Sequence, residues 1–283
     1  MQKDRIRISI STLGCKVNQC DSAAMGESLE NCGYEIVSFV KRANVHIINT
    51  CVVTGKTEAQ SRQIIRRALK TDPLCRVVVT GCYAQKSPTD LKALSDRVHV
   101  IGNREKSDIC LYLSKILNGS NPVSDVSDIL LEKTFTTPTA SRFLDRTRAF
   151  LKIQDGCNSG CSYCIVPSVR GQSRSLPSED VKSRLHLLSR SGYREIVLTG
   201  IHLGAYGLDL PPPTNIVELL QSLEADVQLS RVRIRLSSIE PTEFSDDLIR
   251  FLSQSKTVCP HFHVPLQSGD KAVLKKMRRP YTP

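Results

Sequence analysis

Three cysteines, Cys157, Cys161 and Cys164, lie close together near the middle of the chain in a C-x-x-x-C-x-x-C pattern. Cysteine thiolates are the usual ligands of iron–sulfur clusters, and a cubane cluster contains four irons. Three thiolates on one loop leave the fourth iron without a protein ligand, and a small molecule can bind and react at such an open position. The pattern therefore predicts a 4Fe-4S cluster that takes part in chemistry.

A zinc site is the alternative interpretation of the same loop. Structural zinc commonly takes two C-x-x-C pairs or histidine partners, and no fourth ligand is evident near the loop in the sequence. Unliganded structural thiols would not be expected to gather at this spacing. The iron–sulfur cluster is the favoured prediction, and the zinc site stays open as the second.

A second set of cysteines, Cys15, Cys51 and Cys82, is dispersed along the sequence but shares one kind of position. Each follows a run of residues expected to form a β-strand. In a parallel α/β sheet the carboxyl ends of the strands lie along one edge, where ligands bind. These thiols are therefore expected to converge and can hold a metal, although buried cysteines are also common in ordinary cores.

The chain has eleven cysteines in all. An odd number argues against a fully paired disulfide scaffold, and in a reducing cytosol cysteines are more often metal ligands. The five outside the two sets are expected to be core or surface thiols: Cys20, Cys32, Cys75, Cys110 and Cys259.

The composition indicates a globular protein of 283 residues, long enough for two domains. No apolar run has membrane-spanning length, and the N-terminus lacks the apolar core of a secretory signal, so we expect a cytoplasmic protein with no membrane partner. The net charge of +11 favours a polyanionic partner such as RNA. Many basic proteins bind no nucleic acid, so the charge alone leaves this open.

The elements that position the cysteines alternate between strands and helices. In the first part of the chain we expect strands at 5–11, 34–39, 45–48, 76–80 and 98–101, and helices at 21–31, 57–70, 88–97 and 107–117. Short apolar strands between amphipathic helices imply a parallel sheet covered on both faces. This order predicts an N-terminal α/β domain over residues 1–117, with Asp21 or Ser22 capping its first helix.

Residues 118–145 are rich in loop-forming types and are expected to be a linker. A second series then follows, with strands expected at 149–154, 195–199, 232–237 and 261–266, and helices at 178–191, 216–223 and 246–253. That order predicts a partial or full parallel β/α barrel over residues 146–283. The active site of such a barrel gathers at the carboxyl ends of its strands.

With both cysteine sets considered together, the chain closely resembles the methylthiotransferase family of radical S-adenosylmethionine enzymes from Thr12 to Pro283. Besides the cysteine loop, the resemblance rests on Leu13-Gly-Cys-Lys-Val-Asn-Gln19, Ile48-Asn-Thr-Cys51, Val79-Thr-Gly-Cys-Tyr-Ala-Gln85, Arg170-Gly171, Leu198-Thr-Gly-Ile-His-Leu-Gly204, Ser237-Ser-Ile-Glu-Pro241 and His261-Phe-His-Val-Pro-Leu-Gln-Ser-Gly269.

The sequences of two motifs are most similar to those of the branch that acts on N6-threonylcarbamoyladenosine. These motifs are Gly14-Cys-Lys-Val-Asn-Gln19 and Arg170-Gly-Gln-Ser-Arg-Ser175. The isopentenyladenosine branch more often has Gly-Cys-Gln-Met-Asn, and the branch that modifies a ribosomal protein has Gly-Cys-Pro-Lys-Asn. Methylthiolation of one of these other two targets stays open as an alternative.

The resemblance implies an enzyme with two 4Fe-4S clusters and S-adenosylmethionine as cofactors. Carried over residue by residue, Cys15, Cys51 and Cys82 would bind one cluster, and Cys157, Cys161 and Cys164 the radical cluster. The implied reaction adds a methylthio group to C2 of the modified adenosine beside the tRNA anticodon. The implied partners are the tRNA anticodon loop and an electron donor of the flavodoxin or ferredoxin type. The source of the sulfur cannot be inferred from the sequence.

Barrel geometry and the resemblance together nominate residues that contact S-adenosylmethionine: Tyr163, Thr199, Gly200, Ser238, Glu240 and Gln267. For Glu240 the alternative is an ion pair with Arg235 or Arg174. Candidate phosphate-binding residues are Arg62, Arg66, Arg67, Arg170, Arg174 and Lys275.

Family members usually continue well past the point where this sequence stops, at Arg279-Pro-Tyr-Thr-Pro283. They complete the barrel and add a small C-terminal RNA-binding domain. The barrel is therefore expected to be incomplete and the RNA-binding domain absent. The competing hypothesis is a fragment that binds iron–sulfur clusters or RNA without turnover.

Overall fold

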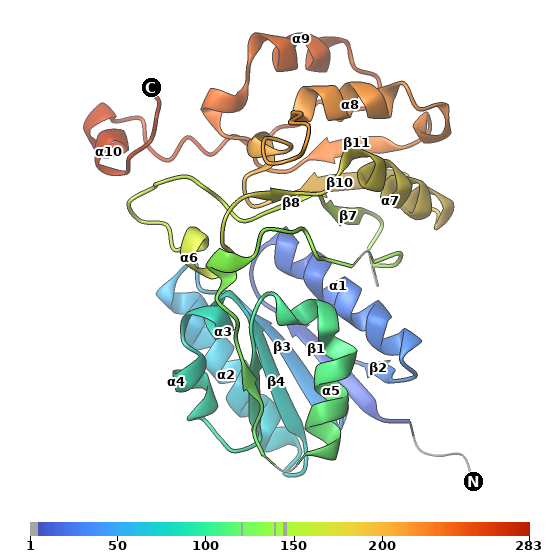
Figure 1. Cartoon of the computed structure of the whole chain (residues 1–283), viewed down its shortest axis with the longest axis vertical. Coiled ribbons are helices and arrows are strands. Elements are labelled where there is room, and N and C mark those ends of the chain that lie inside the picture. The colour runs from blue at the N-terminus through green and yellow to red at the C-terminus, as the bar shows by residue number, and fades with distance from the viewer. Residues whose placement is uncertain (1–4, 120, 139, 144–145) are drawn as a thin grey trace. The chain divides into compact units, whose positions relative to one another are not determined.

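The computed structural model describes residues 5–119, 121–138, 140–143 and 146–283, and Figure 1 labels most of their helices and strands. The chain divides into two compact units. The first comprises Met1–Glu132, Thr136–Ala140 and Ser168–Arg170, and the second comprises Lys133–Phe135, Ser141–Pro167 and Gly171–Pro283. Each unit has its own parallel sheet.

The sheet of the first unit has the strand order β2-β1-β3-β4-β5-β6, and every neighbouring pair is parallel. Every residue of β3 is buried, as expected for a central strand with both faces covered. The short strand β6 lies in the segment that the sequence indicated as a linker. The strands are β1 (Arg7–Thr12), β2 (Glu35–Val37), β3 (Val45–Thr50), β4 (Arg76–Gly81), β5 (Val98–Ile101) and β6 (Ser124–Asp125).

The helices of the first unit are α1 (Lys16–Asn31), α2 (Gly55–Thr71), α3 (Cys82–Lys86), α4 (Pro88–Lys92) and α5 (Ile109–Asn118). One apolar core joins α1 and α5 to the strands, through residues such as Met25, Leu113 and Ile47. Helix α1 begins five residues before its expected start, so the prediction that Asp21 or Ser22 caps it was wrong. Cys15 is the N-cap residue, and both predicted caps are buried inside the helix.

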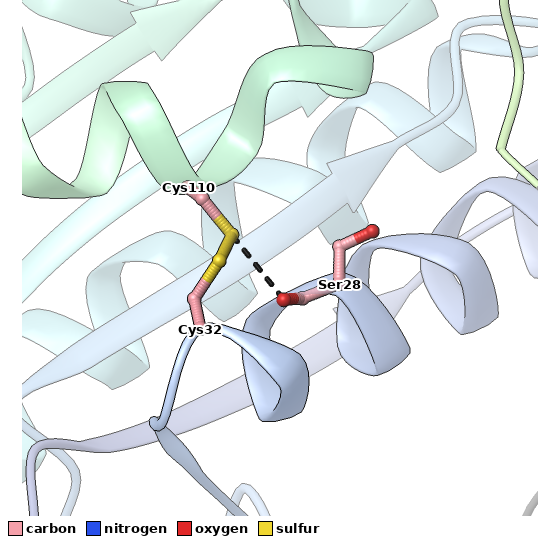
Figure 2. The surroundings of a disulfide bond; sticks show 3 residues. All are labelled: Ser28, Cys32 and Cys110. Atoms are coloured by element: carbon pink, nitrogen blue, oxygen red, sulfur yellow. Dashed lines mark hydrogen bonds between the residues drawn. A yellow bond between two sulfur atoms is a disulfide. The ribbon is translucent and has the colours of Figure 1, made fainter.

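A disulfide joins Cys32, which follows α1, to Cys110 in α5, and Figure 2 shows the bond. Their Cα atoms lie 6.7 Å apart, within the range of ordinary disulfides. The Cys110 sulfur also lies 3.3 Å from the carbonyl oxygen of Ser28. The expectation that both are unpaired thiols was wrong, because the pairing depends on packing between helices that are distant in the sequence.

We expect this disulfide to stabilise the first unit by about 2–4 kcal/mol, because it constrains the unfolded chain. Adding a thiol reductant to cluster-free protein should therefore lower the midpoint of urea unfolding of the first unit. The Cys32→Ser variant should unfold at the reduced midpoint with or without reductant. Equal midpoints for oxidised and reduced wild type would contradict the prediction.

The second unit contains a parallel sheet with the order β11-β10-β7. Its strands alternate with helices in the predicted order, which confirms the α/β class and the partial barrel; the described strands do not form a closed barrel. The elements are β7 (Ala149–Lys152), α7 (Ser178–Arg190), β10 (Glu195–Thr199), α8 (Ile216–Glu224), β11 (Arg233–Leu236), α9 (Asp246–Gln254) and α10 (Lys271–Lys276). A two-stranded antiparallel pair, β8 (Gln154–Asp155) with β9 (Arg174–Ser175), flanks the cysteine loop.

The strand expected at 261–266 is not formed. Isolated bridges alone mark its course, between Ile234 and Val258 and between Ser238 and His263. Pro260 and Pro265 supply no backbone N–H to a ladder, and residues 261–264 are exposed. This segment therefore does not form the strand that the sequence predicts.

In the part of the chain that the structure describes, no helix combines the length and the apolar character needed to cross a membrane.

Candidate functional site

The cysteine loop of the second unit begins with a sharp turn at Gly156, whose φ of +73° lies in the left-handed region. The N–H of Cys157 donates to the carbonyl oxygen of Gly171 at 3.1 Å. A Cβ atom at position 156 would collide with the carbonyl oxygen of Gln172. Glycine is therefore required where the loop leaves β8. At Gly160, inside the loop, a Cβ atom would have no described atom within 4 Å.

Backbone N–H groups point at two of the loop sulfurs. Ser159 donates to Cys157 Sγ at 3.4 Å, and Val166 donates to Cys164 Sγ at 3.4 Å. The three loop cysteines are partly buried, and burial raises the pKa of Cys164. Hydrogen bonds to cysteine sulfur stabilise the thiolate and are among the features that tune iron–sulfur clusters. The loop thus offers three thiols, two of them with donors in place for the charged form.

His202 lies beside the first of these thiols. Its Nδ1 atom is 3.6 Å from Cys157 Sγ, its Nε2 atom pairs with Glu243 Oε1, and its backbone N–H donates to Gln154 Oε1 at 2.7 Å. Burial tends to raise the pKa of Cys157, but hydrogen bonds from His202 and Ser159 outweigh it and leave that pKa below the ordinary value. Cys157 and Glu243 in turn raise the pKa of His202 to about 10.

The sequence pattern does not single out His202 as a cofactor contact, although this residue stands in the motif that follows β10. Its position just past the carboxyl end of a barrel strand is the signal that could have identified it.

Two of the predicted cofactor contacts, Tyr163 and Glu240, both bind the side chain of one arginine. Arg279 Nη1 lies 2.9 Å from Glu240 Oε2, and Arg279 Nη2 donates to the Tyr163 hydroxyl at 2.5 Å. The alternative pairing of Glu240 with Arg235 is not found, because Arg235 pairs with Glu195 at 2.7 Å. Arg279 stands in a basic stretch of the sequence that is typical of a solvated helix face, but the structure buries its side chain.

Thr199, Gly200 and Ser238 lie at or just beyond the carboxyl ends of β10 and β11, whereas Gln267 follows no described strand. Thr199 is buried at the end of β10. A Cβ atom at Gly200 would lie 2.8 Å from Gln154 Oε1, so the chain passes closely there. Ser238 Oγ and His263 Nδ1 are 3.2 Å apart, whereas Gln267 is exposed in a left-handed turn at φ 64°.

In the first unit, Cys15, Cys51 and Cys82 follow the carboxyl ends of β1, β3 and β4, which are neighbours in the sheet. A Cβ atom at Gly14 would lie 2.9 Å from Cys51 Sγ, so the turn before Cys15 passes close to Cys51. Burial raises the pKa of Cys51, and the charges of Cys82 and Cys15 raise it further. Cys51 therefore lies within electrostatic range of both other thiols at the edge of the sheet.

Among the described residues, no group of three or more His, Cys, Asp or Glu side chains is arranged to hold a single metal ion. A cubane cluster separates its ligands, since each thiolate binds a different corner iron. The dispersed sulfurs of each set are compatible with that larger group.

A buried charged network lies behind Cys82. Arg170, which is 2% exposed, directs Nε to Cys82 Sγ at 3.4 Å and Nη2 to Asn18 Oδ1 and to Asp21 Oδ2, the latter at 3.3 Å. Lys106 Nζ lies 2.9 Å from the same oxygen of Asp21. Burial lowers the pKa of Lys106, and Asp21 opposes that shift.

The burial of two arginines contradicts one interpretation of the sequence. Arg170 and Arg174 are both buried and are not the solvent-facing phosphate ligands that the sequence suggests. The members of the network lie on α1, on the 3-10 turn Glu105–Asp108 and at the end of α6 (Val166–Arg170). No local pattern in the sequence could have brought them together.

The exposed basic face of α2 remains available to an anionic partner. Arg66, Arg67 and Lys70 line a surface cavity of about 500 Å³ together with Gln63 and Thr71.

Two protein-family models match the chain. Residues 7–102 match the uncharacterized protein family UPF0004, and residues 151–283 match the radical SAM superfamily. Each match contains one of the two cysteine sets.

Curated relatives match nearly the whole chain. The threonylcarbamoyladenosine tRNA methylthiotransferase MtaB of Bacillus subtilis is 41% identical over 97% of this chain and 60% of its own length. The enzyme of the same name from Aquifex aeolicus is 36% identical over 98% of this chain and 67% of its own length. The chain thus spans between 60% and 67% of the length of these two relatives.

Solved structures share the fold at low identity. The radical S-adenosylmethionine methyltransferase TsrM from Kitasatospora setae superposes with a TM-score of 0.64 at 14% identity, covering 99% of this chain and 63% of that protein. The cobalamin-dependent S-adenosylmethionine radical enzyme OxsB superposes with a TM-score of 0.63 at 12% identity, covering 99% of this chain and 46% of that protein. At this identity the likeness establishes the fold alone.

Proposed function

Because the chain belongs to the family of threonylcarbamoyladenosine tRNA methylthiotransferases, we propose that it adds a methylthio group to C2 of N6-threonylcarbamoyladenosine next to the tRNA anticodon. The observation that carries the proposal is the presence of two cysteine triads, one at the carboxyl ends of the parallel strands β1, β3 and β4 and one on the loop that follows β8, each in its own unit. One triad alone would serve electron transfer or radical initiation. The cluster of the first unit is proposed as the site from which sulfur is delivered.

The residues present fit two 4Fe-4S clusters. Each triad supplies three thiols, which leaves one position of a cubane open. In the loop, N–H donors already point at Cys157 and Cys164. At the sheet edge, the Arg170 guanidinium points at Cys82, and a cation close to a ligand sulfur offsets the negative charge of a thiolate-bound cluster.

When bound, the loop cluster would supply the electron that cleaves S-adenosylmethionine to a 5′-deoxyadenosyl radical. The residues of this chain orient that site. The His202–Glu243 pair fixes the imidazole beside Cys157, and Gln154 holds the backbone of His202. Thr199 is buried at the end of β10, and the next residue, Gly200, packs closely against Gln154.

The proposed nucleic-acid partner is the anticodon loop of tRNA, whose target base must be turned out of its stack to reach a buried site. The net charge of +11 supports a polyanionic partner. Arg66, Arg67 and Lys70 on α2 are the exposed cations proposed to contact RNA phosphate. A flavodoxin- or ferredoxin-type electron donor and a cytoplasmic location belong to the same proposal.

The second candidate function is that of a protein that binds iron–sulfur clusters or RNA without turnover. Methylthio product formed by this chain on a tRNA carrying threonylcarbamoyladenosine would support the enzyme. Tight cluster and RNA binding without product would support the alternative, and product on isopentenyladenosine or a ribosomal protein would reassign the target.

The first test is the iron and acid-labile sulfide content of anaerobically reconstituted protein, together with its electron paramagnetic resonance spectrum. We expect about eight irons per chain, falling to about four in the Cys157/Cys161/Cys164→Ala variant, given one cubane per triad. Four irons falling to none would remove Cys15, Cys51 and Cys82 as ligands. Zinc in place of iron would overturn the radical enzyme altogether.

A further inference from the structure

The side chain of Arg170 belongs to the first unit and is held there by three named partners. Its Nε–H points at Cys82 Sγ, with 3.4 Å between nitrogen and sulfur. Its Nη2 atom donates to Asn18 Oδ1 and, at 3.3 Å, to Asp21 Oδ2. An arginine carries its positive charge at every physiological pH and presents its donors in a rigid, planar fork. The structure therefore aims one donor of a permanent cation at a thiol of the dispersed triad.

The buried side chain of Asn18 fixes the position of this guanidinium. Its Nδ2 atom donates to the carbonyl oxygens of Leu13 at 2.8 Å and of Thr50 at 3.0 Å. These two carbonyl groups lie in the turns that lead into Cys15 and Cys51. Because both amide hydrogens are used there, the amide oxygen is the atom that faces the guanidinium and accepts from it. One amide thus connects the turns of two triad cysteines to the arginine that contacts the third.

The contact between Arg170 and Cys82 is shielded from water. Both residues are buried, and so are Asn18 and Asp21. In surroundings of low dielectric constant a charge acts more strongly on its neighbour than it does in water, and dissolved salt screens it less. The charge of this arginine therefore acts on the sulfur more strongly than the charge of a surface arginine would.

We propose that Arg170 is a positioning residue whose hydrogen bond to Cys82 raises the reduction potential of the cluster in the first unit. This inference rests on the proposed function, which assigns a cluster to Cys15, Cys51 and Cys82. Reduction adds negative charge to a group that is already surrounded by thiolates. A hydrogen bond from a cation to one ligand sulfur stabilises the added charge, and such bonds are among the properties that set the potential of iron–sulfur clusters.

The competing role for Arg170 is purely structural, as a partner of Asp21 in the buried network. A structural partner would affect the stability of the first unit but would leave the potential of a correctly assembled cluster unchanged. An arginine that acts through the Cys82 sulfur changes the potential while the iron content stays the same. Measuring potential and iron content on the same samples therefore separates the two roles.

The test requires the first-unit cluster by itself, in the whole chain. Replacing all three loop cysteines by alanine leaves that cluster as the only one that the proposed function assigns. In this parent protein, and in its Arg170→Met and Arg170→Lys variants, the potential is measured by anaerobic redox titration followed by electron paramagnetic resonance. Asp21 keeps a partner in both variants, because Lys106 Nζ lies 2.9 Å from the same carboxylate oxygen.

Arg97→Met in the same parent protein is the matched control. Arg97 also belongs to the first unit, and its Nη1 atom lies 3.9 Å from the sulfur of Cys75, a thiol outside both triads. Arg170→Met should lower the equilibrium constant for reduction about tenfold, which corresponds to about 59 mV for one electron. Arg170→Lys keeps the charge but loses the planar fork, so it should lower the constant by less. Arg97→Met should leave it unchanged.

Iron and acid-labile sulfide are measured on every variant. Arg170→Met with the iron content and the potential of the parent protein would overturn this inference and leave the proposed function intact. An equal shift in Arg97→Met would also overturn it, since the potential would then follow any loss of a buried arginine. If Arg170→Met alone loses its iron, Arg170→Lys decides: a lowered potential supports the inference, and the parent value overturns it.

Two further outcomes concern assembly of the site. Loss of iron from both Arg170 variants would assign Arg170 to assembly of the site and overturn its role in setting the potential. A parent protein without iron would overturn the cluster that the proposed function assigns to the first unit, and this inference with it.

Discussion

Replacing Gly156 by alanine should empty the cysteine loop of iron. The backbone at this residue has a φ of +73°, which costs a non-glycine residue energy. The new methyl group would also meet the carbonyl oxygen of Gln172 and that of Gly171, at 2.8 Å for the latter. Both obstacles are backbone atoms and cannot swing aside. The loop would have to shift, and Cys157 is the next residue.

The expected result is loss of about half of the bound iron, because one of two cubane sites is disrupted. Formation of 5′-deoxyadenosine should fall by more than about a hundredfold, since displacement of a reacting group by about 1 Å has effects of that size. Gly160→Ala is the matched control, because it places the same methyl group in the same loop where no described atom lies within 4 Å. Iron loading of Gly156→Ala at the wild-type level would refute the prediction.

Replacing Asp21 by asparagine should strongly destabilise the first unit. The carboxylate lies between Lys106 and Arg170, and the side chains of all three are at most 7% exposed. Asparagine has a similar shape but no charge, so Lys106 and Arg170 would both lose the carboxylate charge of Asp21. Breaking a buried ion pair by removing one partner costs about 3–5 kcal/mol.

Hydrogen exchange of peptides from the first unit, followed by mass spectrometry, measures this loss locally. The double variant Asp21→Asn/Lys106→Met removes one surplus cation and should recover part of the stability. Lys86→Gln is the control, because its pair with Glu58 is considerably more exposed and should contribute at most about 1 kcal/mol. Equal protection in Asp21→Asn and wild type would show that Asp21 does not carry the charge balance.

Much of the fold follows from local features of the sequence. The strands β3, β4 and β10 are apolar runs that stop at polar or glycine residues, and they lie where the pattern predicts them. The positions of Cys51 and Cys82 at strand ends follow from the same runs. The residues of the motifs predict the family and its branch, and the curated relatives confirm both.

The departures have a common physical cause. Helix α1 starts at Lys16 because the chain turns at Gly14, whose φ is +99°, and local capping rules do not register that turn. The segment with Pro260 and Pro265 resembles a strand in its apolar residues but lacks the N–H donors for a ladder. Local patterns predict elements well only where the backbone hydrogen bonds agree with them.

The side-chain networks could not be predicted. Asp21 and Arg170 are separated by 149 positions, and Cys32 and Cys110 by 78. Arg279 meets Tyr163 across 116 positions. Each contact depends on the packing of two elements, and the sequence of either element alone carries no signal for it.

The different spacing of the two cysteine triads has a consequence for how the protein matures. Cys157, Cys161 and Cys164 share one short loop, and bringing such close residues together costs little chain entropy. Under the proposed ligand assignment, the loop would be able to bind iron before the rest of the chain has folded. The triad of the first unit comes from the ends of β1, β3 and β4 and exists only after these strands have aligned, so metal capture there is coupled to folding. Under the proposed ligand assignment, a chain whose first unit fails to fold would hold iron in the loop alone.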